Sequence, residues 1–259
     1  MIYIKTKQEI DIIREGGKIL SSILNNVISH AKAGAKICDL DKMAEELILK
    51  KGGVPSFKNY GGDGKNSLGF PSTMCISINN EVVHGSGKRK IILQTGDIVD
   101  FDIGMRYPAK GGLYTDMSKT IGVGKISKIA QKLIKVTKKS LALGIEQIKE
   151  GNRIIDIARA IQNHAENAGF SVVRDLTGHG VGKEVHEDPK IPNYVDNHFG
   201  KIELKQGMVI AIEPMINVGK YKIKTLNDGW TVATADNSLS AHFEHTVAVT
   251  KTGYEILTI

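Results

Sequence analysis

The sequence contains little cysteine and no long apolar run. Its two cysteines, Cys38 and Cys75, are too few for a disulfide framework or a thiolate zinc site, so we expect reduced thiols. No apolar run approaches the roughly 20 residues that a membrane span needs, and the first ten residues, MIYIKTKQEI, have no signal-peptide core. We therefore expect a cytoplasmic protein with no membrane association.

Aromatic residues are also scarce, at 5% of the chain. The net charge is nevertheless +7, from 35 Lys and Arg against 28 Asp and Glu. An excess of positive charge raises non-specific affinity for nucleic acid or ribosomes. Because the lysines are scattered and no aromatic residues alternate with them, a solvated lysine-rich surface is the simpler explanation. Transient association with the ribosome stays open as an alternative.

Two amphipathic helices are predicted in the first part of the chain. Thr6 and Glu9 form a capping box at the start of the first helix, over residues 7–30. Asp39 is expected to cap the second helix, over residues 40–51, which ends at a glycine pair. A glycine-rich loop follows, and the next predicted elements are short strands at residues 74–78 and 81–84.

The second part of the chain repeats this order. Ser127 is expected to begin a long helix that ends near residue 149, and a further helix covers residues 154–168. Strands are predicted at residues 171–174, 208–217, 231–233 and 243–250. The repeat predicts a single α+β domain, residues 1–259, with pseudo-symmetric halves of about 1–122 and 123–259. Its antiparallel sheet would be covered on one face by four helices, which leaves the other face free for a site.

A hairpin over residues 97–120 joins these two parts. Apolar residues alternate in it with Asp100 and Asp102 at the period of a strand. A carboxylate in an apolar strand is unfavourable unless something pairs with it. Folding the hairpin about Ala109 places Asp102 opposite Asp116, and facing carboxylates repel unless a cation lies between them. Either a metal binds there, or one aspartate faces solvent or caps the turn.

Three other residues could bind a metal with these aspartates. His179 lies on a glycine-rich bend, and Glu213 and Glu244 each interrupt an apolar strand. Each alone fits an ordinary loop or strand-edge role. Together with Asp102 and Asp116 they supply four carboxylates and one imidazole, too much negative charge for one divalent ion, whereas two ions bridged by carboxylates balance it. Oxygen-rich coordination with one histidine suits Co, Mn, Fe or Zn.

Seven motifs follow one another in the chain: CISINNEVVHG (75–85), GDIVDFDIG (96–104), TDMSKT (115–120), TGHGVGKEVHEDP (177–189), IEPM (212–215), DGWTV (228–232) and SAHFEHTVAVT (240–250). In the order of these motifs the chain resembles the type I methionine aminopeptidases, in their short bacterial-like form. The resemblance covers essentially all positions and implies the pita-bread fold, a pseudo-two-fold α+β domain. It implies that Asp102, Asp116, His179, Glu213 and Glu244 bind two divalent ions, with Asp116 and Glu244 bridging them.

The implied reaction is hydrolytic removal of the initiator methionine from nascent polypeptides when the second residue is small. By resemblance the enzyme would be a monomer in which Glu213 accepts a proton, and His186 stabilises the tetrahedral intermediate. His84 would assist proton delivery at the scissile amide. Sulfur and aromatic edges suit a thioether. The residues expected around the methionine side chain are Tyr60, Phe70, Cys75 and Trp230.

Some positions depart from the family pattern. The loop between Asp102 and Asp116 is a few residues longer than expected, which could shift the second aspartate. Residues 61–69 resemble an insertion beside the methionine pocket, so the matches of Tyr60 and Phe70 depend on its alignment.

Two other functions fit parts of this pattern. Proline-directed peptidases such as aminopeptidase P and prolidase share the fold and the five ligands. They generally carry an N-terminal domain, whereas the first helix here is expected at about residue 7, and the DGWTV motif favours the methionine enzymes. A non-catalytic member of the fold that binds RNA or the ribosome would be expected to have lost ligands, and all five are present here.

Overall fold

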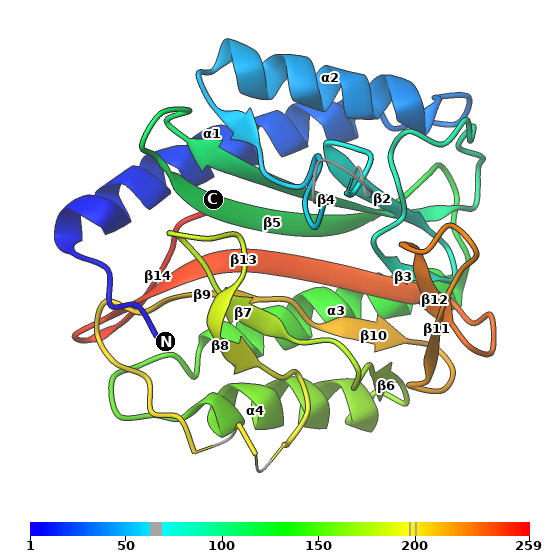
Figure 1. Cartoon of the computed structure of the whole chain (residues 1–259). Helices are drawn as coiled ribbons and strands as arrows, with labels where there is room; N and C mark the ends of the chain where they lie inside the picture. The colour runs from blue at the N-terminus through cyan, green and yellow to red at the C-terminus, as the bar shows by residue number, and fades with distance from the viewer. Residues whose placement is uncertain (63–68, 197, 200) are drawn as a thin grey trace.

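In the computed structural model of the chain, residues 1–62, 69–196, 198–199 and 201–259 are described. They form a curved antiparallel sheet with helices packed along it (Figure 1). All four predicted helices are present among these residues. They are α1 (Lys7–His30), α2 (Ile37–Lys50), α3 (Lys128–Ile145) and α4 (Ile154–Asn167).

The large sheet has the strand order β1-β4-β5-β13-β9-β7-β8, with β2 beside β4, β14 beside β13, and β10 between β13 and β6. A small sheet has the order β11-β12-β3. The strands are β1 (Val54–Pro55), β2 (Met74–Ile78), β3 (Glu81–Val83), β4 (Ile98–Tyr107), β5 (Leu113–Gly122), β6 (Ser171–Val172), β7 (Gly178–Gly180), β8 (Glu187–Ile191), β9 (Val209–Ile212), β10 (Met215–Asn217), β11 (Ile223–Thr225), β12 (Val232–Thr234), β13 (Ser240–Thr250) and β14 (Gly253–Ile256). The expected α+β class is therefore confirmed.

The apolar cores lie between the helices and one face of the sheet. Leu20 and Leu24 of α1 are fully buried in one cluster with Phe101 and Ile103 of β4. Successive strand residues point to opposite faces, so Asp100 and Asp102 project from the face away from α1. A second cluster joins α3 and α4 to β9 and β13. The helices therefore cover one face and leave the carboxylate-bearing face free, as the sequence predicts.

The capping predictions were right for two helices and wrong for a third. The Thr6 hydroxyl accepts the Glu9 N–H (3.2 Å), and the Thr6 N–H donates to the Glu9 carboxylate (2.7 Å). Ser127 accepts the Ala130 N–H at 3.2 Å. Asp39, however, is not a cap. Helix α2 begins at Ile37, which puts Asp39 in the first turn, where its negative charge favours the positive end of the helix dipole.

The register of the central hairpin differs from the expected one. Asp102 pairs with Ser118, and Asp116 pairs with Gly104, so the turn is centred on Lys110 and not on Ala109. A shift of one residue at the turn displaces every partner by two. Because side chains alternate with period two, Asp102 and Asp116 still project from the same face, offset diagonally.

Other strand boundaries changed as well. The strand expected at residues 208–217 is divided into β9 and β10 at Glu213 and Pro214, since proline has no N–H for a ladder. The bend that carries His179 is strand β7, which sequence reasoning missed together with β1, β8, β11 and β14. The expected insertion at residues 61–69 lies mostly outside the described residues. Within the described part of the chain, no helix has the length and apolarity that crossing a membrane requires.

Candidate metal centre

The five proposed metal ligands lie on neighbouring strands of the large sheet. Asp102 is on β4, Asp116 on β5, Glu244 on β13 and His179 on β7. Glu213 follows β9 directly. The sheet order β4-β5-β13-β9-β7 places these strands side by side (Figure 1). Residues that are more than 140 positions apart in sequence are therefore brought to one face, because Glu244 pairs with Ser118 and His179 with Ala211.

The side chains of three of these residues converge on the ring of a fourth, His179. Its Nε2 atom lies 3.6 Å from Asp116 Oδ2, 3.5 Å from Glu213 Oε1 and 4.0 Å from Glu244 Oε1. Two atoms bound to one ion at about 2.1 Å each can be at most about 4.2 Å apart, so all three distances fit a shared cation. The other ring nitrogen donates to the Gly180 carbonyl at 2.9 Å, which leaves Nε2 free to bind a metal.

The electrostatics of this cluster favour a bound cation. Burial, and then repulsion among the carboxylates, raises the pKa of Glu213 and Glu244 well above the usual range. Burial also raises the pKa of Asp102 far above its usual value and that of Asp116 to about 6. Asp102 Oδ1 is buried with no hydrogen-bond partner among the described residues. Such a group is unfavourable unless a positive charge neutralises it, so the donor set fits divalent metal ions.

Two further histidines border a cleft of about 550 Å³ that also includes His179 and Glu213. The His84 and His186 side chains are exposed to this cleft. The ring of His186 lies 4.4 Å from that of His179, centroid to centroid. His84 has φ +60°, a left-handed conformation that non-glycine residues rarely adopt and that is concentrated at functional sites. Both are therefore available to a substrate in the cleft.

The residues expected around a methionine side chain make three separate contacts. The Tyr60 hydroxyl lies 2.7 Å from His186 Nδ1. Phe70 packs edge-on against Trp230, with ring centroids 5.5 Å apart. Cys75 on β2 pairs with Asp102 of β4 and is buried. Burial and the negative charge of Asp102 raise the pKa of the Cys75 thiol, which keeps it protonated.

Sequence reasoning assigned no role to three buried residues, of which two contact the cluster and the third, Asp100, contacts His242. His242 Nδ1 donates to Asp100 Oδ2 (3.2 Å), and His242 Nε2 lies 3.7 Å from Glu213 Oε2. Burial alone would lower the pKa of His242, but Asp100 raises it overall. The Thr246 hydroxyl contacts Asp116 Oδ1 at 3.1 Å. Every second side chain of a β-strand points to the same face, and this rule could have identified all three. Asp100 lies two residues before Asp102, and His242 and Thr246 lie two residues before and after Glu244.

Comparison with known proteins agrees with this geometry. The model of metallopeptidase family M24 matches residues 11–251. A methionine aminopeptidase of Clostridium perfringens is 48% identical over 260 residues, and the match covers 100% of this chain and 99% of that protein. The chain belongs to the methionine aminopeptidases of family M24. As a member of this family, the chain is a metallopeptidase, an enzyme that requires divalent metal.

Solved structures give the same result for the fold. The crystal structure of a methionine aminopeptidase from Rickettsia prowazekii superposes with a TM-score of 0.92 at 39% identity, covering 100% of both chains. The chain therefore has the pita-bread fold. A prolidase from Pyrococcus horikoshii gives a TM-score of 0.76 at 22% identity, and this chain covers 63% of it. That likeness shows the shared fold alone and does not favour a proline-directed peptidase.

Proposed function

We propose that this protein is a dinuclear metallohydrolase that removes the N-terminal methionine from nascent polypeptides when the second residue is small. The observation that carries the proposal is the convergence of Asp116, Glu213 and Glu244 on His179 Nε2 within 4.0 Å. The full-length similarity to methionine aminopeptidases supports the choice of substrate.

Five residues would hold two divalent ions: Asp102, Asp116, His179, Glu213 and Glu244. Two ions would balance the four buried carboxylates better than one. Co, Mn, Fe and Zn all suit this oxygen-rich set with one imidazole. When bound, such ions lower the pKa of water and polarise the substrate carbonyl.

The chain's own residues would position the substrate and move its protons. Glu213 is proposed to accept the proton of the attacking water, because its Oε1 lies 3.5 Å from His179 Nε2 and its side chain lines the cleft. His186 would donate from Nε2 to the carbonyl oxygen as negative charge develops there. The Tyr60 hydroxyl at 2.7 Å from Nδ1 can donate to that nitrogen, which would place the His186 proton on Nε2. His84 would deliver a proton to the leaving amine.

Substrate choice follows from the space around these groups. Tyr60, Phe70, Cys75 and Trp230 are proposed to surround the methionine side chain, as soft and aromatic partners of a thioether. The second side chain would lie between the metal cluster and the residues His84 and His186. A bulky one would displace the scissile carbonyl, and a displacement of about 1 Å can lower the rate roughly 10²-fold.

A comparison of three peptides tests this function. The metal-loaded protein should release methionine from Met-Ala-Ser and should leave Ala-Pro-Ala intact. It should cleave Met-Leu-Ser at least about 10²-fold more slowly than Met-Ala-Ser. Equal rates on Met-Ala-Ser and Met-Leu-Ser would refute the size rule, and preferential cleavage of Ala-Pro-Ala would assign the chain to the proline-directed peptidases instead.

The cellular setting is part of the same proposal. Both cysteines are free, which fits the reducing cytoplasm where nascent chains emerge. The net charge of +7 would favour transient contact with the ribosome, a polyanion. We propose a monomer, because the proposed ligands and both cleft histidines come from one chain.

A further inference from the structure

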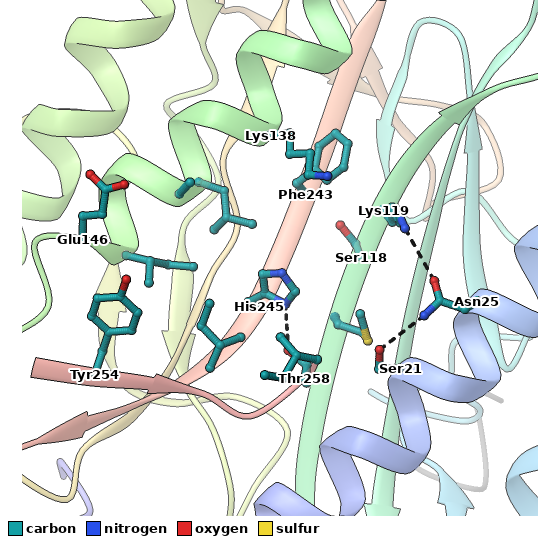
Figure 2. A pocket seen from close by; sticks show the side chains of 16 residues that line it. Ser21, Asn25, Ser118, Lys119, Lys138, Glu146, Phe243, His245, Tyr254 and Thr258 are labelled. Atoms are coloured by element: carbon teal, nitrogen blue, oxygen red, sulfur yellow. Dashed lines mark hydrogen bonds between the residues drawn. The ribbon is translucent and has the colours of Figure 1, made fainter.

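A second cavity, of about 390 Å³, lies between α1 and α3, on the helix-covered side of the sheet (Figure 2). Phe243 and His245 of β13 line it and flank Glu244, and Met117 of β5 lines it next to Asp116. Since neighbouring strand residues point to opposite faces, this cavity and the metal cluster lie on opposite sides of the same two strands. It is therefore separate from the cleft with His84 and His186.

One part of this cavity is lined by positive and hydrogen-bonding groups. Lys119 and Lys138 come from β5 and α3, and His245 lies with them in Figure 2. Among the described residues, the Lys119 ammonium has one hydrogen-bond partner, Asn25 Oδ1 at 3.5 Å, and Lys138 forms no ion pair. His245 Nδ1 lies 2.9 Å from the Thr258 hydroxyl, while its Nε2 makes no hydrogen bond to a described residue.

The rest of the wall is mostly apolar. Leu141 and Ile145 of α3 line it together with Phe243 and Ile256. One carboxylate side chain, that of Glu146, also reaches the cavity. In Figure 2 it lies at the left edge, whereas Lys119 lies on the right. Glu146 is paired with Lys139 at 3.6 Å. The cavity therefore combines an apolar surface with two ammonium groups that pair with no carboxylate in the described part of the chain.

The two ammonium groups and the apolar wall together indicate the chemical class of ligand that the cavity would bind. An ammonium pair repels cations, and a bare inorganic anion would leave the apolar wall uncovered. Burial of an apolar body contributes roughly 25 cal/mol for each Å² removed from water. A few polar groups beside a mostly apolar wall, in a volume of a few hundred Å³, are typical of small-molecule sites. We propose that this cavity binds a small amphipathic carboxylate, such as a medium-chain fatty acid, with its head group at Lys119 and Lys138.

Calorimetric titration of the metal-loaded protein with octanoate tests the proposal. Methionine is added at saturating concentration so that the active-site cleft is occupied. Octanoate should bind with one-to-one stoichiometry, at least about 10-fold more tightly than octanol, and octylamine should not bind. Equal binding of octanoate and octanol, or no binding of octanoate, would overturn the proposal. Because the readout is binding and not turnover, its failure is distinct from failure of the proposed aminopeptidase function.

Variants locate the site. The double variant Lys119→Gln/Lys138→Gln should weaken octanoate binding about 10-fold or more and leave octanol binding unchanged. Lys135→Gln is the matched control, since Lys135 is exposed on the same helix α3 but does not line the cavity, and it should bind octanoate as the parent does. Ala142→Phe should block both ligands by filling the cavity. Parent-like octanoate affinity in the double variant would place the carboxylate elsewhere and refute the assignment, whether or not Ala142→Phe folds.

Discussion

At the scale of single residues, a substitution of His186 should affect catalysis without affecting metal binding. It lies beside His179 in the cleft, and Tyr60 contacts its Nδ1 at 2.7 Å. Its donor is needed chiefly when charge develops on the carbonyl oxygen, so His186→Ala should lower kcat about 10²-fold or more while metal affinity changes little. Steady-state kinetics on Met-Ala-Ser and metal titration calorimetry on the same variant measure the two effects.

Two other variants serve as controls for that result. His84→Ala should behave in the same way but more mildly. Asp102→Ala should lose metal affinity, because it removes a ligand. A loss of metal affinity in His186→Ala as large as that in Asp102→Ala would make His186 a ligand and contradict its proposed role.

The sequence predicted which residues of the cluster could bind metal better than it predicted their surroundings. Carboxylates in apolar strands are conspicuous because they are unfavourable there, so Asp102, Glu213 and Glu244 stood out in the sequence. Each alone also fitted an ordinary role, and only the whole set predicted a metal site. The contact of His242 with Asp100 joins β13 to β4, strands 142 residues apart at these positions. Local periodicity carries no information about such a pairing, and the roles of all these residues stay predictions.

At the scale of elements, a buried ion pair holds the segment that carries His186. The Lys5 ammonium contacts Glu187 Oε2, and both side chains are almost fully buried. Glu187 Oε1 accepts the N–H groups of Lys183 (2.5 Å) and Glu184 (3.0 Å). Lys5→Met leaves the Glu187 charge buried without its cation, which should cost about 3–5 kcal/mol of unfolding free energy. Urea denaturation measures this loss.

A double-mutant cycle tests whether the pair is the cause. Lys5→Met/Glu187→Gln removes both charges and should recover a substantial part of the stability, since the Gln side-chain oxygen can still accept the two N–H groups. Lys7→Met, a surface change two residues away, should have little effect. If the double variant is as unstable as the sum of the single variants, the two charges do not interact energetically.

Prediction of elements succeeded where local chemistry determines them. The capping residues Thr6 and Ser127 set the starts of α1 and α3. Each accepts a hydrogen bond from the backbone N–H three residues further along the chain. The hairpin was found, but its register was wrong because one residue at the turn shifts every pair by two. Strand β7, Gly178–Gly180, was missed because its glycines have no β propensity and its pairing with β9 comes from tertiary structure.

At the scale of the whole molecule, one carboxyl outside the metal cluster makes stability depend on pH. Asp41 of α2 is buried and accepts the Met74 N–H at 2.8 Å. Burial raises its pKa to about 6. The folded state therefore binds a proton that the unfolded state has released above about pH 4, so this group's contribution to stability falls as pH rises from about 4 to 6. The loss should be on the order of 2–3 kcal/mol at pH 7.

Unfolding free energies at several pH values between 4.5 and 7, with chelator present, measure this effect. Asp41→Asn cannot titrate, so its stability relative to the parent protein should increase as pH rises through this window. Asp39→Asn, an exposed carboxylate on the same helix, is the matched control and should follow the parent. Parallel pH profiles of Asp41→Asn and the parent would show that Asp41 does not take up a proton on folding.

The order of predicted helices and strands along the chain was most informative about the layered arrangement of the whole molecule. The succession of two helices and antiparallel strands, twice over, predicted the layers because each helix pair must cover one face of the sheet. The exact strand order, in which β13 lies between β5 and β9, depends on packing of segments from both parts of the chain. The division into pseudo-symmetric halves at about residue 122 stays a prediction.

The central claim is that the clustered carboxylates and His179 form a metal centre that carries out methionine removal. The most direct measurement is the initial rate of methionine release from Met-Ala-Ser by chelator-treated protein, before and after Mn²⁺ or Co²⁺ is restored. We predict that the metal-free protein is at least about 10²-fold slower and that activity returns with metal. Cleavage at the full rate by protein shown to contain no metal would contradict the account.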